Sequence, residues 1–213
     1  MVEIYTTEEE QVEAIKRWWD KNGKSVLILV VAVLASVFAS QRWIEHRNGQ
    51  AELASFMYQN MLDTIETQPQ VADEKARALI GEFPDTTYAA LAGMTLARLS
   101  MDKGEAEQAM AHLQWVIGNA SDAALVDLAH LRLAKVQLQL NKPDDALKSI
   151  ETVTTPAFRA EANELRGDSL LVQGKVNEAV AAYRNALSGY TDQPAKRSIV
   201  SMKLADLAAS EES

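Results

Sequence analysis

The sequence predicts an all-α protein in which one membrane-spanning helix precedes a solenoid of stacked helix pairs. Two observations support this fold class. The run from Ser25 to Gln41 is 17 residues long and carries no charge. After it, apolar residues recur at helical spacing between short turns, and no stretch alternates polar and apolar residues as a strand does. We therefore expect three segments: a tail at 1–24, an anchor at 25–44 and a repeat domain at 45–213.

The uncharged run fits an uncleaved signal anchor better than two alternatives. Extended to Ile44, it makes a segment of about 20 residues, roughly 30 Å of helix, which matches the hydrocarbon core of a bilayer. A buried helix of a soluble protein has a polar face, whereas Ser36 is the sole polar residue in the middle of this run. A cleaved signal peptide begins with basic residues, whereas residues 1–24 carry six acidic ones.

The residues that flank the anchor predict its orientation. On the exit side, Arg42 can snorkel and Trp43 can lie among the headgroups. Basic residues near a membrane span favour the cytoplasmic side, and acidic residues have little influence on orientation. Four basic residues precede the anchor and two follow it closely. We therefore expect a cytoplasmic tail and a translocated repeat domain. The basic residues compared are Lys16, Arg17, Lys21 and Lys24 against Arg42 and Arg47.

The tail contains a second segment that is expected to meet the membrane. Between residues 11 and 21, apolar residues recur at roughly helical spacing among charged ones. This pattern predicts a short amphipathic helix in the inner headgroup layer, with Trp18 and Trp19 facing the acyl chains. Asn22-Gly23 is expected to end this helix before the anchor. The helix either fixes the register of the anchor or docks a membrane partner.

Composition excludes some classes of function. The chain has 21 basic and 30 acidic residues, of which residues 42–213 hold 17 and 24. An acidic domain is a poor candidate for nucleic-acid binding, which needs concentrated positive charge. Because the sequence contains no cysteine, disulfides and thiol chemistry are excluded, which suits an oxidising compartment without proving one.

The segment after the anchor contains a degenerate repeat of helix pairs. One copy has a small residue at Gly167, a turn at Gly174 and an aromatic residue at Tyr183. Alanine and leucine residues at matching offsets complete the tetratricopeptide pattern. Another copy lies 33 residues upstream, and a third lies 37 residues before that. The corresponding residues in these copies are Ala134, Asn141 and Ile150, and then Ala97, Gly104 and Leu113.

Both ends of the solenoid can be predicted from the same pattern. Ala72, Ala76 and Leu79 belong to the second helix of an earlier pair, whose first helix runs from Arg42 to Glu66. The helices are expected to be about 12–18 residues long and joined by tight turns. A final helix, from Ala195 to Ala209, is expected to cap the solenoid. Its predicted inward side consists of Ile199, Met202, Leu204 and Leu207.

The sequence shows no cluster of catalytic or metal-binding residues. The histidines His46, His112 and His130 are far apart and lack metal-ligand spacing. There is no phosphate-binding loop and no nucleophile elbow. Asp144 and Asp145 follow Pro143 at a helix start, where carboxylates favour the helix dipole. We therefore expect no catalysis, no cofactor and no metal.

A binding surface remains as the expected function. The first helix of each pair lines the concave side of such a solenoid. The repeat phase predicts a mixed groove with a methionine-containing apolar end, a basic pair and an acidic end, which suits several partners. The predicted groove residues are Leu91, Met94, Arg98, Met101, Leu131, Lys135, Leu138, Glu164 and Asp168, together with Leu128, Glu161 and Leu171.

Several blocks of sequence resemble the YfgM family, which comprises ancillary subunits of the bacterial SecYEG translocon. The blocks are Glu3-Ile4-Tyr5, residues 11–19, Asn22-Gly23-Lys24, residues 88–91, residues 131–137 and residues 165–168. The resemblance implies a bacterial inner-membrane protein with a periplasmic repeat domain. It also implies association with the translocon and with PpiD, a membrane-anchored periplasmic chaperone, and assistance to emerging secretory proteins.

Three hypotheses about function follow. The first is a non-enzymatic, chaperone-like scaffold of the translocon, whose groove binds PpiD or an emerging chain and whose anchor contacts lipid and channel. The second is a regulator of envelope-stress signalling that acts through the cytoplasmic tail. The third, an envelope enzyme or enzyme activator, has no cluster of catalytic groups to support it.

Overall fold

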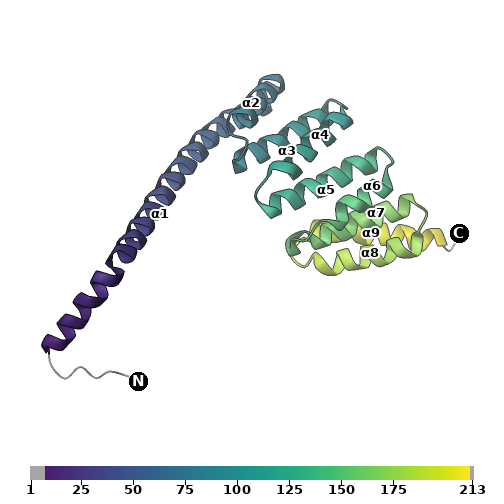
Figure 1. Cartoon of the computed structure of the whole chain (residues 1–213). Helices are drawn as coiled ribbons and strands as arrows, with labels where there is room; N and C mark the ends of the chain where they lie inside the picture. The colour runs from purple at the N-terminus through teal and green to yellow at the C-terminus, as the bar shows by residue number, and fades with distance from the viewer. Residues whose placement is uncertain (1–7, 212–213) are drawn as a thin grey trace. The chain divides into compact units, whose positions relative to one another are not determined.

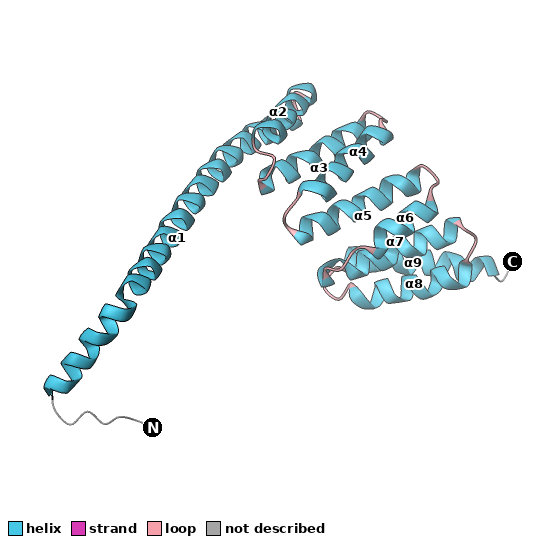
Figure 2. Ribbon diagram, viewed as in Figure 1, coloured by secondary structure: helices cyan, strands magenta, loops and turns pink. Residues whose placement is uncertain are grey.

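The computed structural model describes residues 8–211, which form nine α-helices, one short 3₁₀-helix and no β-strand (Figure 1 and Figure 2). The all-α class is confirmed. The chain forms two compact units, one up to Gly49 and one from Gln50 onward. In chain order the helices are α1 (Glu8–Ile65), α2 (Pro69–Glu82), α3 (Thr87–Asp102), α4 (Ala106–Asn119), α5 (Ala123–Gln139), α6 (Pro143–Glu151), η1 (Pro156–Phe158), α7 (Arg159–Val172), α8 (Val176–Gly189) and α9 (Pro194–Glu211).

Helix α1 is 58 residues long and contains the predicted anchor. Within the described part of the chain it is the helix long and apolar enough to cross a membrane. The predicted break at Asn22-Gly23 is wrong, because the helix continues through it. Asn22 donates a hydrogen bond to the Trp18 carbonyl one turn earlier, and the Trp19 indole covers Gly23. These contacts offset the cost of a helical glycine, which is about 1 kcal/mol. The block Glu3-Ile4-Tyr5 lies outside the described residues.

The second unit is a stack of antiparallel helix pairs, in which α3 packs on α4, α5 on α6 and α7 on α8 (Figure 1). The pairs approach closely where one helix has a small residue and the other a large one. A Cβ atom at Gly167 would lie 2.5 Å from the Tyr183 ring, and one at Gly93 would lie 2.7 Å from Val116. Glycine is therefore required at both positions for this packing.

The turns inside the three pairs share one geometry, and this confirms the predicted repeat phase. Gly104, Asn141 and Gly174 all have φ angles between 55° and 78°. At each turn, the next residue donates its backbone N–H to the carbonyl five residues back, over 2.8–2.9 Å. This is the Schellman arrangement, which favours glycine and tolerates asparagine. Asn141 thus takes the place that glycine has in the neighbouring repeats.

Helix α6 has nine residues and is shorter than the predicted minimum of about twelve. The buried carboxylate of Asp127 on α5 explains the early end. It accepts hydrogen bonds from the backbone N–H groups of Thr154 and Thr155, at 3.0 and 2.7 Å. Burial raises the pKa of Asp127, but these hydrogen bonds outweigh burial and leave its pKa lowered. The segment after α6 is therefore held in a non-helical form against α5.

Helix α9 closes the end of the stack, but its predicted inward side is wrong in part. Val200 and Leu207 are buried and Leu204 is half-buried against α8, whereas Ile199 and Met202 are exposed. The lysines of α9 explain this register, because Lys196 and Lys203 turn toward acidic residues of α7. Turning Ile199 inward would break these ion pairs.

Candidate docking groove of the repeat domain

A groove of about 400 Å³ lies between α5, α7 and α9. Its floor contains three apolar residues, one from each helix, and its walls are charged. We call it the concave groove. It is lined by Lys135, Leu138 and Gln139 from α5, by Glu161, Glu164, Leu165 and Asp168 from α7, and by Lys196 and Ile199 from α9.

The charges of the concave groove largely neutralise one another. Glu161 accepts hydrogen bonds from both Lys135 and Lys196. Lys203 donates to Glu164 at 3.0 Å and to Asp168 at 2.7 Å. Three cations from two helices therefore face three carboxylates of α7. The carboxylates at the predicted acidic end of the groove are therefore paired with lysines, so net charge alone does not attract a ligand.

These ion pairs determine the titration of the groove. Burial raises the pKa of Glu161, but hydrogen bonds from Lys135 and Lys196 outweigh it and leave the pKa lowered. Burial lowers the pKa of Lys203, but hydrogen bonds to Asp168 and Glu164 outweigh it and leave that pKa raised. Both groups are therefore charged at neutral pH.

Two tyrosines of the last repeat donate hydrogen bonds to carboxylates of the groove. The Tyr183 hydroxyl donates to Asp168 at 2.7 Å, and the Tyr190 hydroxyl donates to Glu164 at 2.7 Å. Burial and the neighbouring carboxylates raise the pKa of both tyrosines well above its usual value. Both phenols therefore stay protonated and act as fixed donors. The groove wall is thus rigidly positioned before any ligand binds.

The structure brings together five of the predicted groove residues and separates the others. Lys135, Leu138, Glu164 and Asp168 line the concave groove, together with Glu161. Met94 and Leu131 lie in the core and are 3% and 0% exposed, so their predicted place in the groove is wrong. Their side chains turn toward neighbouring helices, because a first helix is covered on both flanks. Leu91, Met101 and Leu128 are half-buried and Leu171 is exposed.

Arg98 lines a different hollow, so the predicted basic pair with Lys135 is wrong. This hollow measures about 380 Å³ and lies between the end of α1, the start of α2 and α3. Arg98 is exposed there beside Asp102 and Lys103. Lys103 in this hollow forms an ion pair with Asp73 of α2 at 3.5 Å.

Sequence reasoning missed the contribution of α9 to the groove. Lys196 and Lys203 are seven residues apart, as are their partners Glu161 and Asp168. Matched spacing of opposite charges on two helices indicates that the helices pair side by side. This signal was present in the sequence, but it could be used only once the lysines of α9 were known to reach α7.

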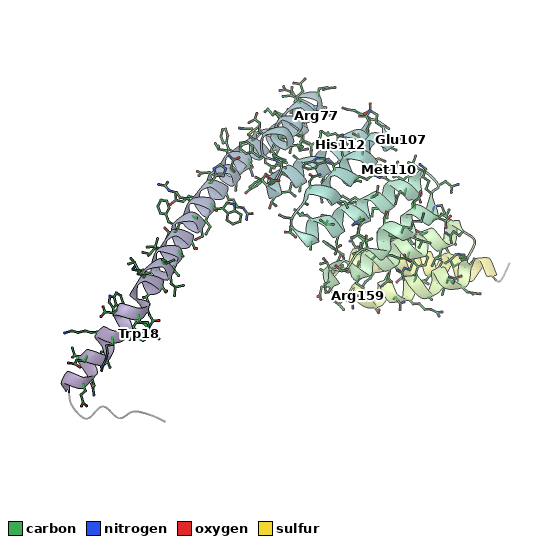
Figure 3. All side chains as sticks on the ribbon, viewed as in Figure 1. Trp18, Arg77, Glu107, Met110, His112 and Arg159 are labelled. Atoms are coloured by element: carbon green, nitrogen blue, oxygen red, sulfur yellow. The ribbon has the colours of Figure 1, made fainter. Side chains whose placement is uncertain are left out.

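The residues predicted to meet the membrane are exposed on α1. The indoles of Trp18, Trp19 and Trp43 are each more than half exposed, and Figure 3 shows Trp18 projecting from the helix. The Arg42 guanidinium lies 5.4 Å from the Phe38 ring, and that of Arg47 lies 4.8 Å from the Trp43 ring. Their contact with lipid stays a prediction.

The described residues contain no group of three metal-ligating side chains. His112 on α4 and His130 on α5 are half-buried, and burial lowers the pKa of both imidazoles. Figure 3 shows His112 beside Arg77, whose charge lowers the His112 pKa further.

The fold and the apolar helix define a tetratricopeptide-repeat protein with one candidate membrane anchor. A family model described as "Tetratricopeptide repeat-like domain" matches residues 16–209. The sequence is 34% identical over 206 residues to the ancillary SecYEG translocon subunit of Escherichia coli K12, covering 97% of this chain and 99% of that protein. It is 32% identical to the subunit of the same name from Aggregatibacter actinomycetemcomitans, covering 85% and 90%. The chain belongs to the family of ancillary SecYEG translocon subunits, the YfgM family.

Solved structures of MamA show the same fold. A MamA crystal structure superposes with a TM-score of 0.54 at 19% identity, covering 64% of this chain and 72% of that one. MamA from Desulfovibrio magneticus RS-1 gives a TM-score of 0.53 at 16% identity, covering 77% and 98%. At this identity the likeness concerns the fold alone.

Proposed function

We propose that this chain is a non-enzymatic ancillary subunit of the SecYEG translocon. The observation that carries the proposal is the 34% identity to the Escherichia coli subunit of that name, which runs over 97% of the chain. The likeness therefore includes both the apolar helix and the repeats. The relatives and the single apolar helix fit a single-pass protein of the inner membrane. The distribution of basic residues supports a cytoplasmic N-terminus and a periplasmic repeat domain.

The concave groove is the proposed binding site for PpiD or for emerging secretory proteins. Its floor of Leu138, Leu165 and Ile199 can take apolar side chains of an extended segment. Its compensated charges favour no ligand of one sign, which suits partners of varied sequence. The tetratricopeptide scaffold supports this proposal, because its concave surfaces are used for binding.

Co-purification from native membranes in mild detergent tests the association with the translocon. The full chain is compared with a form whose residues 1–41 are replaced by an unrelated anchor. SecYEG subunits and PpiD are expected with the full chain. Their presence with both forms assigns docking to the repeat domain, and their loss with the foreign anchor assigns it to residues 1–41. If neither form retains translocon subunits, the proposal fails and regulation through the cytoplasmic tail replaces it.

Site-specific photo-cross-linking tests the groove. A photo-reactive residue at Ile199, in the groove, is compared with one at Arg184, which is exposed on α8. The groove position is expected to cross-link to PpiD or to a stalled secretory chain, and the α8 position is not. Equal cross-linking at both positions would remove the groove from the proposal.

A further inference from the structure

The first helix of the repeat domain has an apolar face that no helix covers. In the segment 50–65 of α1, Ala54 and Met61 are fully buried against α2 and α3. On the opposite side, Leu53 and Phe56 are 56% and 67% exposed. In a solenoid each helix pair buries one face against the pair before it. Within residues 8–211 no helix pair comes before α1, and the exposed face of α1 lacks the covering helix that the later repeats have.

Acidic residues accompany the uncovered apolar residues. Glu52 lies one turn before Phe56 and Asp63 lies two turns after it, so all three share a side of α1. Residues 50–66 contain three acidic residues and no basic one. Within residues 8–211, neither Glu52 nor Asp63 forms an ion pair. We call Glu52, Leu53, Phe56 and Asp63 the leading face.

We propose that the leading face docks a basic amphipathic helix of another membrane-anchored protein. A helix is the natural occupant, because a helix takes the corresponding place in every later repeat. Its apolar stripe would cover Leu53 and Phe56, and its Lys or Arg residues would pair with Glu52 and Asp63. Leu53 follows the candidate membrane span closely in sequence, so a partner anchored in the same membrane meets this face at high effective concentration.

Charge argues against the two other occupants. A second copy of the chain would bring acidic residues against acidic residues, which is unfavourable at helical contacts. An anionic lipid surface repels the same carboxylates. The proposal does not depend on the concave groove, whose residues come from α5, α7 and α9.

Peptide binding to the full chain tests the proposal directly. The protein is placed in nanodiscs of phosphatidylcholine, a lipid without net charge. The probe is a fluorescein-labelled helical peptide with a leucine stripe flanked by lysines, and the comparison peptide has glutamates in place of the lysines. The lysine peptide is expected to bind at least about tenfold more tightly, which fluorescence anisotropy measures.

Two variants with a matched control locate the binding site. Leu53→Ser with Phe56→Ser is expected to weaken binding of the lysine peptide about tenfold or more. The control is Val172→Ser with Met202→Ser, which removes two exposed apolar side chains outside both the concave groove and the leading face and leaves binding unchanged. Glu52→Lys with Asp63→Lys keeps the apolar residues and is expected to reverse the preference between the two peptides. This variant provides the test if the serine variant fails to fold.

Four results would overturn the proposal. The first is that the two peptides bind equally well, and the second is that the Val172 and Met202 control loses as much binding as the variant at Leu53 and Phe56. The third is that the chain dimerises through Leu53 and Phe56 and binds neither peptide, in which case the occupant is a second copy. The fourth is that the lysine peptide binds nanodiscs without protein as tightly as nanodiscs with protein, in which case the lipid is the ligand.

Discussion

The two ends of the helical stack differ in how their terminal helices are packed and in whether their charged side chains are paired. At the C-terminal end, α9 buries Val200 and Leu207 and forms ion pairs with three carboxylates of α7. At the N-terminal end, α1 leaves Leu53 and Phe56 exposed beside unpaired carboxylates. Terminal repeats of a solenoid normally present a polar outer face. The C-terminal end also exposes Ile199 and Met202, but its lysines are paired with carboxylates of α7. Within the described residues, the carboxylates beside Leu53 and Phe56 have no such partner, and we infer that another protein completes the N-terminal end.

The same helix-pair unit thus serves stability at one end and binding at the other. The two ends differ in what surrounds an apolar pair, because Ile199 borders a lined groove whereas Phe56 borders solvent and acidic residues. Substitutions on the packed side of α9 and on the exposed side of α1 should therefore have unequal effects on folding and binding.

The largest expected contrast comes from placing one charge at each end. Val200→Asp buries an unpaired carboxylate at a fully buried position and is expected to lower the free energy of unfolding by about 3 kcal/mol or more. Leu53→Asp introduces the same group at an exposed position and should change it by no more than about 0.5 kcal/mol. Urea unfolding of the full chain in detergent, followed by circular dichroism, measures both. Equal effects would contradict the proposed difference between the ends.

Glycine substitutions test the packing of the last repeat against that of the first. Gly167→Ala forces its Cβ to within 2.5 Å of the Tyr183 ring and is expected to destabilise the protein by about 1–3 kcal/mol. Gly81→Ala in α2 meets no atom within 4 Å and is expected to stabilise by up to about 1 kcal/mol. A stabilising Gly167→Ala variant in thermal unfolding would show that the ring moves aside freely.

Acidification should loosen the contact between α7 and α9 at the C-terminal end of the stack. The Glu161 pKa is lowered from its ordinary value of 4.5 in the folded protein. Its contribution to stability is therefore complete above pH 4.5 and is lost as the pH falls through the lowered value. Amide hydrogen exchange of α9, corrected for the intrinsic pH dependence of exchange, should accelerate over this range in the native chain, and Glu161→Gln should reduce the pH-dependent part. Unchanged exchange of α9 at low pH would show that the pairs contribute nothing.

The smallest expected effect on folding belongs to the charges of the leading face. Glu52→Lys with Asp63→Lys changes exposed groups without ion pairs and should alter the free energy of unfolding by no more than about 0.5 kcal/mol. Thermal unfolding checks this. A large loss of stability would mean that these carboxylates serve the fold and are not kept for a partner.

The repeat could be predicted because local chemistry specifies it. Gly104, Asn141 and Gly174 mark turns that need a positive φ angle, and Gly167 and Tyr183 mark one close helix contact. The turn conformation depends on a few neighbouring residues, and the close contact lies within one helix pair, so both can be recognised in the sequence. The break at Asn22-Gly23 was predicted wrongly for a related reason, since a local breaker signal was outweighed by contacts within α1.

The groove could be predicted only in part, because it depends on contacts between distant helices. Repeat phase identified Lys135, Leu138, Glu164 and Asp168. It also included Met94 and Leu131, which are buried. The repeat phase predicts which side of a helix a residue lies on, but it does not predict whether a neighbouring helix covers that residue. The register of α9 depends on carboxylates more than 30 residues away on α7, and helical periodicity carries no information about them.

Hydrogen–deuterium exchange with the lysine-flanked peptide tests the difference between the two ends most directly. The full chain in neutral nanodiscs is measured with and without the peptide. The account predicts new protection in residues 50–65 of α1 and unchanged exchange in α9. Protection confined to α9, or spread evenly over both ends, would contradict it.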